Sequence, residues 1–184
     1  MKKPLLLCLS CLVALTMTQC IEDNDGASGD STGWHIDTTD DGYYVDLGLL
    51  SMTMWKSANE VNPADTNNDF FTYDEAIATF GDKLPTKEQF EELWRSCQWK
   101  WLDIGCYKVT GPSGRFILLP ADGSRDCHGG VSYLRSYGFY WSSTPDGSEK
   151  AWYLNFYYKE VTMYNYHRCY GNSVRLVKDV DDYK

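Results

Sequence analysis

The sequence predicts an α+β fold, with two helices early in the chain and a mainly antiparallel, twisted sheet with long loops after them. The first observation is a capping box, because Thr86 and Gln89 have the spacing that satisfies free backbone groups at a helix N-terminus. The second is a change to period-two alternation after Cys97. The third is the Gly/Pro/Ser sequence of residues 111–114, which lies between two apolar runs and is typical of a hairpin turn.

Two segments have helical character. Residues 74–80 predict a short helix that Gly81 ends. A second helix begins after Thr86 and ends near Cys97. Its apolar residues fall at helical spacing, so we expect them to form one stripe that faces the core: Phe90, Leu93, Trp94 and Cys97.

Strands are expected where β-branched and aromatic residues gather between turn residues. These segments are a short hairpin over 42–55 and single strands at 98–101, 107–110, 116–120, 138–143, 151–158, 161–166 and 173–177. The polar segments 62–69 and 121–136 are expected to be loops. Four tryptophans are assigned to core packing: Trp99, Trp101, Trp141 and Trp152.

The N-terminus predicts export. Lys2 and Lys3 precede a short apolar run, so residues 1–19 are typical of a lipoprotein signal peptide rather than a membrane span. We expect Cys20 to be acylated, residues 20–41 to form an acidic flexible tether, 42–179 to form one domain and 180–184 to be an acidic tail. The expected location is the bacterial outer membrane, facing the exterior, with the N-terminal lipid as the only contact with the membrane.

The charge limits the class of partner. The formal net charge is -9, and loss of the two leader lysines makes it -11. A surplus of acidic residues of this size argues against nucleic acid and anionic lipid surfaces as partners.

The cysteines of the predicted domain allow disulfides, because an exported protein meets an oxidising environment. They are Cys97, Cys106, Cys127 and Cys169, and the sequence leaves their three possible pairings open. Cys127 precedes His128, but a disulfide or an inert loop thiol is favoured over an activated thiolate. No spacing of Cys or His residues indicates a metal site, and no cofactor is expected.

Several motifs carry a resemblance to a known family. They are residues 84–86 (Leu-Pro-Thr), 99–101 (Trp-Lys-Trp), 109–114 (Val-Thr-Gly-Pro-Ser-Gly), 116–121 (Phe-Ile-Leu-Leu-Pro-Ala), 140–143 (Tyr-Trp-Ser-Ser) and 171–177 (Gly-Asn-Ser-Val-Arg-Leu-Val). In this order they resemble the Fibrobacter succinogenes major paralogous domain family over nearly all of the predicted domain. The segment 122–125 and three of the cysteines depart from that family's pattern.

The resemblance implies a C-type-lectin-like fold, related to that of formylglycine-generating enzymes, on an exported lipoprotein of Bacteroidetes type. In this fold the late strands and their loops form the ligand face. The Glu-Pro-Asn, Gln-Pro-Asp and Trp-Asn-Asp motifs with which calcium-dependent lectins bind Ca²⁺ are absent from the sequence, so no calcium requirement is expected.

Alternation predicts the ligand face in residue detail. Within 152–158, one set of side chains (Trp152, Leu154, Phe156) is expected to face the core and the other (Tyr153, Asn155, Tyr157) to face outward. Tyrosine offers rigid contact area and asparagine adaptable hydrogen bonds. With the neighbouring loops, the predicted ligand-binding residues are Tyr133, Arg135, Tyr137, Tyr153, Asn155, Tyr157, Tyr164, Asn165, Tyr166, His167, Arg168 and Tyr170.

Two interpretations of this tyrosine-rich segment remain open. Its residue types (Asn, Tyr, His, Cys, Arg and Ser) can all be reached from an AAY codon when adenines are replaced. In this respect the chain resembles the variable proteins of diversity-generating retroelements. An ordinary tyrosine-rich surface is the alternative. The leading functional hypothesis is a non-enzymatic module that binds a glycan or a protein; a structural component of the cell surface and a formylglycine-generating-type catalyst are the alternatives.

Overall fold

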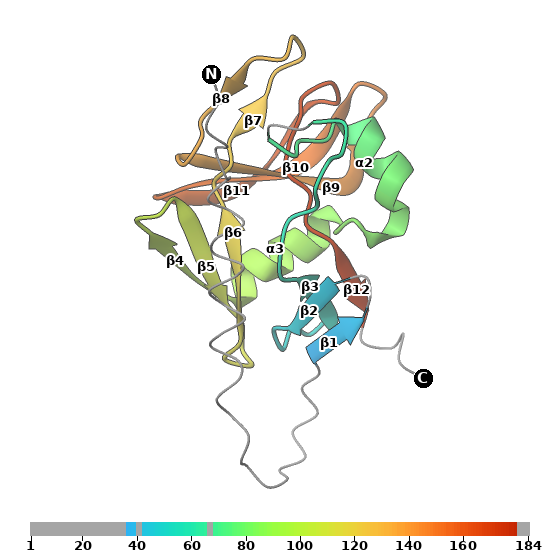
Figure 1. Cartoon of the computed structure of the whole chain (residues 1–184). Helices are drawn as coiled ribbons and strands as arrows, with labels where there is room; N and C mark the ends of the chain where they lie inside the picture. Colours follow the sequence, from blue (N-terminus) through green and yellow to red (C-terminus); the bar gives the residue numbers. More distant parts are fainter. Residues whose placement is uncertain (1–35, 40–41, 66–67, 180–184) are drawn as a thin grey trace, which may run out of the picture. The chain divides into compact units, whose positions relative to one another are not determined.

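The computed structural model describes residues 36–39, 42–65 and 68–179, all within one unit, Trp34–Lys184 (Figure 1). The predicted signal peptide, the lipidated Cys20, most of the tether and the tail at 180–184 lie outside the described residues. None of the helices in the described part has the length and apolar character of a membrane span.

The first sheet has four antiparallel strands in the order β1-β2-β3-β12. Its strands are β1 (Ile36–Thr39), β2 (Gly42–Asp46), β3 (Thr53–Lys56) and β12 (Val177–Asp179), so it joins the start of the domain to its end. The hairpin expected within 42–55 is confirmed by β2 and β3. Two expectations are wrong. Residues 36–39 were assigned to the tether but pair with β2, and the strand expected at 173–177 is instead an isolated bridge at Ser173 followed by β12.

Both predicted helices are present, as α2 (Tyr73–Phe80) and α3 (Lys87–Ser96), with a short turn η1 (Gly81–Lys83) between them. The capping box of α3 is confirmed: the Gln89 backbone N–H donates to the Thr86 hydroxyl at 3.2 Å, and the Thr86 N–H donates to the Gln89 side chain at 2.8 Å. Thr72 and Glu75 form a second capping box on α2.

The apolar stripe of α3 is narrower than predicted. Phe90 and Leu93 are fully buried and Cys97 is half-buried, but Trp94 is 41 % exposed. At about 100° per residue, Trp94 lies on the far side of Phe90 from Leu93, at the rim of the stripe. It is therefore a surface side chain rather than a core one.

The predicted hairpin around 111–114 is part of a three-stranded antiparallel sheet made of β4 (Gln98–Leu102), β5 (Cys106–Thr110) and β6 (Phe116–Pro120). A second three-stranded antiparallel sheet has the order β11-β10-β9, with β9 (Tyr137–Asp146), β10 (Lys150–Tyr157) and β11 (Glu160–His167). A small hairpin, β7 (Ser124–Arg125) and β8 (Val131–Ser132), precedes β9, so the segment 121–136 is not wholly a loop as expected.

The two helices lie on opposite faces of the β9–β11 sheet (Figure 1). Phe90 and Leu93 of α3 pack in a core cluster with Leu154 and Phe156, whereas Tyr73 and Ala76 of α2 pack in a second cluster with Trp141 and Ala151. Because side chains alternate along β9 and β10, these two clusters must occupy the two sides of the sheet. The fold is therefore α+β with two helices and mainly antiparallel sheets, as predicted.

Candidate ligand-binding face

The alternation predicted for β10 is confirmed for residues 153–157. Trp152, which was expected in the core, is only partly buried and belongs to neither core cluster, and the Lys87 ammonium lies over its ring at 3.6 Å. Leu154 and Phe156 enter the core, whereas Tyr153, Asn155 and Tyr157 point to the other side of the sheet. The strand register builds that side from three cross-strand rows, each with one residue of β9, β10 and β11: Trp141, Tyr153 and Tyr164; Phe139, Asn155 and Thr162; Tyr137, Tyr157 and Glu160.

Aromatic rings form a connected surface on this side. Tyr137 contacts Tyr157 and Tyr133, each with ring centroids 5.1 Å apart, and Phe139 joins Tyr133 to Tyr153. Tyr153 reaches Tyr164 on β11 at 6.4 Å. We call the following set the tyrosine face: Tyr133, Tyr137, Phe139, Tyr153, Tyr157, Tyr164, Tyr166 and Tyr170.

The far end of the tyrosine face is a second aromatic pair. Tyr166 lies two residues after Tyr164 on the same side of β11, and its ring meets that of Tyr170 edge-on at 4.6 Å. A hydrogen bond with Tyr166 raises the pKa of Tyr170, and Tyr133 and Asp126 act in the same direction. The end of β11, the turn after it and the 123–136 segment therefore meet at this end.

Solvent reaches the tyrosine face unevenly. Tyr133, Tyr164 and Tyr166 are 58 %, 48 % and 43 % exposed, while Tyr153 is half-buried between its neighbours. Burial, followed by the nearby Tyr164 and Tyr166 hydroxyls, raises the pKa of Tyr153 to about 12. At physiological pH Tyr153 is thus a neutral phenol that can donate and accept hydrogen bonds.

Asn155 does not present its amide as predicted. Only 8 % of the residue is exposed, and its side-chain N–H donates to the Gly138 carbonyl at 3.3 Å. Asn155 lies on the predicted side of β10, but its side chain is buried there. It supports the tyrosine face and is not available as a contact.

The segment 133–137 is held in an unusual backbone conformation. Tyr133 and Arg135 have φ values of 65° and 58°, in the left-handed region that side chains rarely adopt. Backbone hydrogen bonds fix them: Arg135 N–H donates to Ala121 O at 2.7 Å, and Tyr137 N–H donates to Tyr133 O at 3.1 Å. Strain of this kind concentrates at functional sites.

Three predicted residues lie away from the tyrosine face. Asn165 and His167 alternate with Tyr164 and Tyr166, so they point to the side of β11 that carries Val161 and Met163. The Arg168 guanidinium lies over the Tyr73 ring at 4.5 Å and donates to the Ser148 carbonyl at 3.1 Å. The structure therefore separates these residues from the other predicted contacts.

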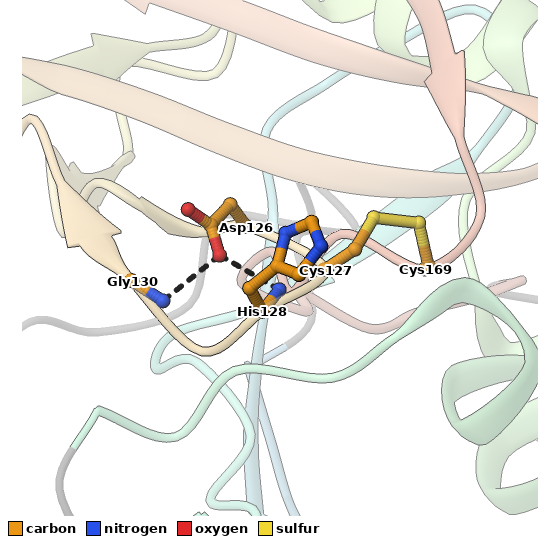
Figure 2. The surroundings of a disulfide bond; sticks show 5 residues. All are labelled: Asp126, Cys127, His128, Gly130 and Cys169. Carbon is orange, nitrogen blue, oxygen red and sulfur yellow. Dashed lines mark hydrogen bonds between the residues drawn. A yellow bond between two sulfur atoms is a disulfide. The ribbon is translucent and has the colours of Figure 1, made fainter.

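A disulfide ties two loops together beside the tyrosine face. Cys127 bonds to Cys169, with their Cα atoms 5.1 Å apart, and Figure 2 shows this bond next to the 126–130 turn. Asp126 shapes that turn, because its carboxylate accepts hydrogen bonds from the His128 and Gly130 N–H groups at 2.8 and 2.9 Å. These bonds lower the pKa of Asp126. The pairing that the sequence left open is thus Cys127 with Cys169, and Cys127 carries no free thiol.

The other two cysteines are thiols in protected positions. Burial and the nearby Glu92 carboxylate raise the pKa of Cys97 to about 12, and burial with Asp122 raises that of Cys106. Neither has the depressed pKa of a nucleophilic cysteine. Among the residues that the structure describes, no group of three His, Cys, Asp or Glu side chains is placed to hold a metal ion.

The comparison with known families concerns this same part of the chain. A family described as a domain of unknown function (DUF8237) matches residues 112–177, about a third of the chain. The match runs from within the β5–β6 turn to the first residue of β12, and so includes the whole tyrosine face. No curated protein and no solved structure matches the chain significantly.

Three residues of this region were not predicted as contacts. Phe139 was assigned only to a strand. It alternates with Tyr137 and Trp141 along β9, which puts it on the side of the sheet that carries the tyrosine face. Tyr158 is 57 % exposed in the turn after β10, where an aromatic residue has no core to enter. Trp101 was assigned to the core, and it packs there, but it also lines a hollow with Tyr157 and Tyr158.

Proposed function

We propose that this protein is a non-enzymatic ligand-binding module, displayed on the bacterial outer membrane through an acylated Cys20, whose tyrosine face binds a glycan or a protein. The observation that carries the proposal is the continuous aromatic contact from Tyr133 to Tyr164, with partly exposed rings on a rigid sheet. The α+β arrangement, with late strands bearing this face, supports a C-type-lectin-like domain as the finer description.

Physical chemistry favours recognition by such a face. Tyrosine loses little conformational entropy on binding, and its ring and hydroxyl provide apolar contact and a hydrogen bond together. A connected patch of exposed apolar area on a soluble domain is typical of an interaction site. The rings also support one another, so their positions are set before the ligand arrives, which lowers the cost of binding.

The strained segment 133–137 supports the same proposal. Backbone bonds hold Tyr133 and Arg135 in left-handed geometry at the edge of the tyrosine face. A segment with no role beyond connection would more easily carry glycine or asparagine at such positions. The cost of keeping tyrosine and arginine there is consistent with use of their side chains.

The experiment is a screen of the full-length protein, in detergent, on a glycan array and on an array of cell-surface proteins. A Tyr164→Ser/Tyr166→Ser variant removes two exposed rings of the face. Trp94→Ser is the matched control, because Trp94 is 41 % exposed and Tyr166 is 43 % exposed, but Trp94 lies on α3. We expect specific binding that the double variant loses and the control keeps.

Other outcomes separate the alternatives. A structural component of the cell surface would bury the same rings against another subunit, so the protein would bind no array member and would co-purify as a larger assembly that the double variant disrupts. A catalyst related to formylglycine-generating enzymes would show turnover. Either result would overturn the proposal.

A further inference from the structure

A hollow with aromatic walls lies at one end of the tyrosine face. Its volume is about 330 Å³, within the size range of small-ligand sites, which is about 300–1,000 Å³. Three separate parts of the chain line it: Trp101 of β4, Arg135, Ser136 and Tyr137 of the strained segment, and Tyr157 and Tyr158 at the end of β10.

The walls of the hollow are held by contacts with one another and with Tyr107. The Trp101 ring packs edge-on against Tyr107 at 5.1 Å, and the Tyr107 hydroxyl donates to the Tyr157 carbonyl at 3.0 Å. The Tyr137 and Tyr157 rings lie 5.1 Å apart, tilted by 30°. Tyr158 stands nearly perpendicular to Tyr157, at 74°. The result is a partly enclosed, prearranged site with flat apolar surfaces.

Arg135 supplies a cation to this site. Among the described residues, none forms an ion pair or a side-chain hydrogen bond with the Arg135 guanidinium. Its backbone is fixed instead: the N–H donates to Ala121 O, and Gly105 packs so closely that a Cβ there would lie 2.9 Å from Arg135 O. The chain thus holds a free guanidinium at the hollow, on a backbone that cannot easily move away.

The charges at the mouth favour one anionic group. The Lys159 ammonium lies over the Tyr158 ring at 4.8 Å but does not line the hollow. The nearby Glu160 carboxylate accepts a hydrogen bond from the Tyr157 hydroxyl at 3.2 Å. Among the residues that line the hollow, Arg135 alone carries a charge, so the hollow presents a cation on a chain with a formal net charge of -9. Arginine binds carboxylates through two parallel N–H donors.

We propose that this hollow binds a carboxylate-bearing sugar, a pyranose of the uronic acid type. The apolar C–H faces of the ring pack on Tyr157 and Trp101, and the carboxylate meets Arg135. The Tyr137 and Ser136 hydroxyls are then within the same site for the ring hydroxyls. This inference rests on the proposed function and names the ligand class for one end of the tyrosine face.

The test uses matched pairs of ligands with the full-length protein in detergent. Methyl glycosides of galacturonic and glucuronic acid differ from those of galactose and glucose in the carboxylate. Binding is measured by calorimetry and by the NMR shift of the Arg135 Nε–H. We expect each acidic sugar to bind at least about tenfold more tightly than its neutral partner, as a charge-assisted pair provides.

Variants locate the effect. Arg135→Gln should remove the preference for the acidic sugar, and Arg135→Lys should restore only part of it, because lysine lacks the planar fork. Arg95→Gln is the control, since Arg95 is an exposed arginine on α3. Near-ultraviolet circular dichroism checks that each variant is folded.

Two results would overturn the inference. Equal affinity for acidic and neutral sugars, or an unchanged preference for the acidic sugar in Arg135→Gln, would show that Arg135 does not bind the carboxylate. Binding of acidic peptides without binding of any uronic acid would indicate that the ligand is a protein and not a sugar. In both cases the array result with Tyr164→Ser/Tyr166→Ser would still decide whether the tyrosine face is a binding surface.

Discussion

Arg175 and Asn59 are joined by two hydrogen bonds, from Arg175 Nε and Nη2 to the Asn59 side-chain oxygen, at 2.9 and 2.6 Å. Arg175 is only 1 % exposed, and burial lowers its pKa. The Asn59 amide nitrogen in turn donates to Asp122 and to the Tyr140 hydroxyl, each at 3.1 Å. Asn59 therefore links the buried Arg175 guanidinium to Asp122 and to the Tyr140 hydroxyl.

Asn59→Ala should be strongly destabilising. It leaves a buried guanidinium short of acceptors, so we expect the free energy of unfolding to fall by about 3 kcal/mol. Urea denaturation measures this. Arg95→Ala is the control, because it removes an exposed ion pair with Glu91 on α3 and should cost about 0.5 kcal/mol or less. A loss below about 1 kcal/mol for Asn59→Ala would contradict this assignment.

Removal of the Cys127–Cys169 disulfide should destabilise the domain and loosen one end of the tyrosine face. The bond closes a loop with a sequence separation of 42 residues, for which a loss of about 2–4 kcal/mol is typical. The variant is Cys127→Ser/Cys169→Ser, with hydrogen exchange of the 126–132 and 166–171 backbone as the local readout. Non-reducing peptide mapping of the native protein checks the pairing, and any other pairing would refute it.

The two free thiols should react slowly in the native protein. The pKa of Cys97 is raised from 9.0 to about 12 in the folded state, so its thiol stays protonated at pH 8. Alkylation followed by mass spectrometry should show at least about a tenfold slower reaction at pH 8 than in urea, because the thiolate is the nucleophile. Rapid native modification of Cys97 at pH 8 would be incompatible with its placement.

The same shift predicts a change of stability with pH. A group that holds its proton more tightly when folded stabilises the protein below its unfolded pKa and loses that contribution as the pH rises. For Cys97 the contribution is complete below about pH 9 and declines between pH 9 and 12. Cys97→Ala should therefore flatten the alkaline part of the stability profile; an unchanged profile would count against the shift.

Arg135→Asn should separate stability from binding. Asparagine tolerates left-handed geometry better than arginine, so the free energy of unfolding should stay level or rise by up to about 1 kcal/mol. Binding at the hollow should be lost with the guanidinium. Thermal unfolding and the uronic acid titration measure the two effects on one sample. A clear loss of stability would show that Arg135 contributes to packing rather than carrying strain.

Local signals explain which parts of the fold could be predicted. The capping box at Thr86 and Gln89 and the alternation of residues 153–157 in β10 depend on residues close in sequence, and both are confirmed. The same spacing was present at Thr72 and Glu75 and could have been used. The exposure of Trp94 could not be predicted, because a residue at the rim of an apolar stripe has the same sequence spacing as a buried residue at its centre.

Contacts between distant residues could not be predicted in the same way. The pairing of β12 with β3 and of Cys127 with Cys169 joins segments that are far apart in the sequence and meet only in the folded chain. The burial of Asn155 depends on the Gly138 carbonyl in the neighbouring strand. Likewise, only the folded chain brings Trp101 to Arg135, so the hollow had no signature in the sequence.

The central claim is that the tyrosine face is the contact surface, and the most direct test is affinity across single variants. For a ligand found on the arrays, Tyr164→Ser and Tyr166→Ser should each raise the dissociation constant by about tenfold or more, as loss of an aromatic contact typically does. Trp94→Ser, of similar exposure, should leave it unchanged. Unchanged affinity in both tyrosine variants, or an equal loss in Trp94→Ser, would contradict the claim.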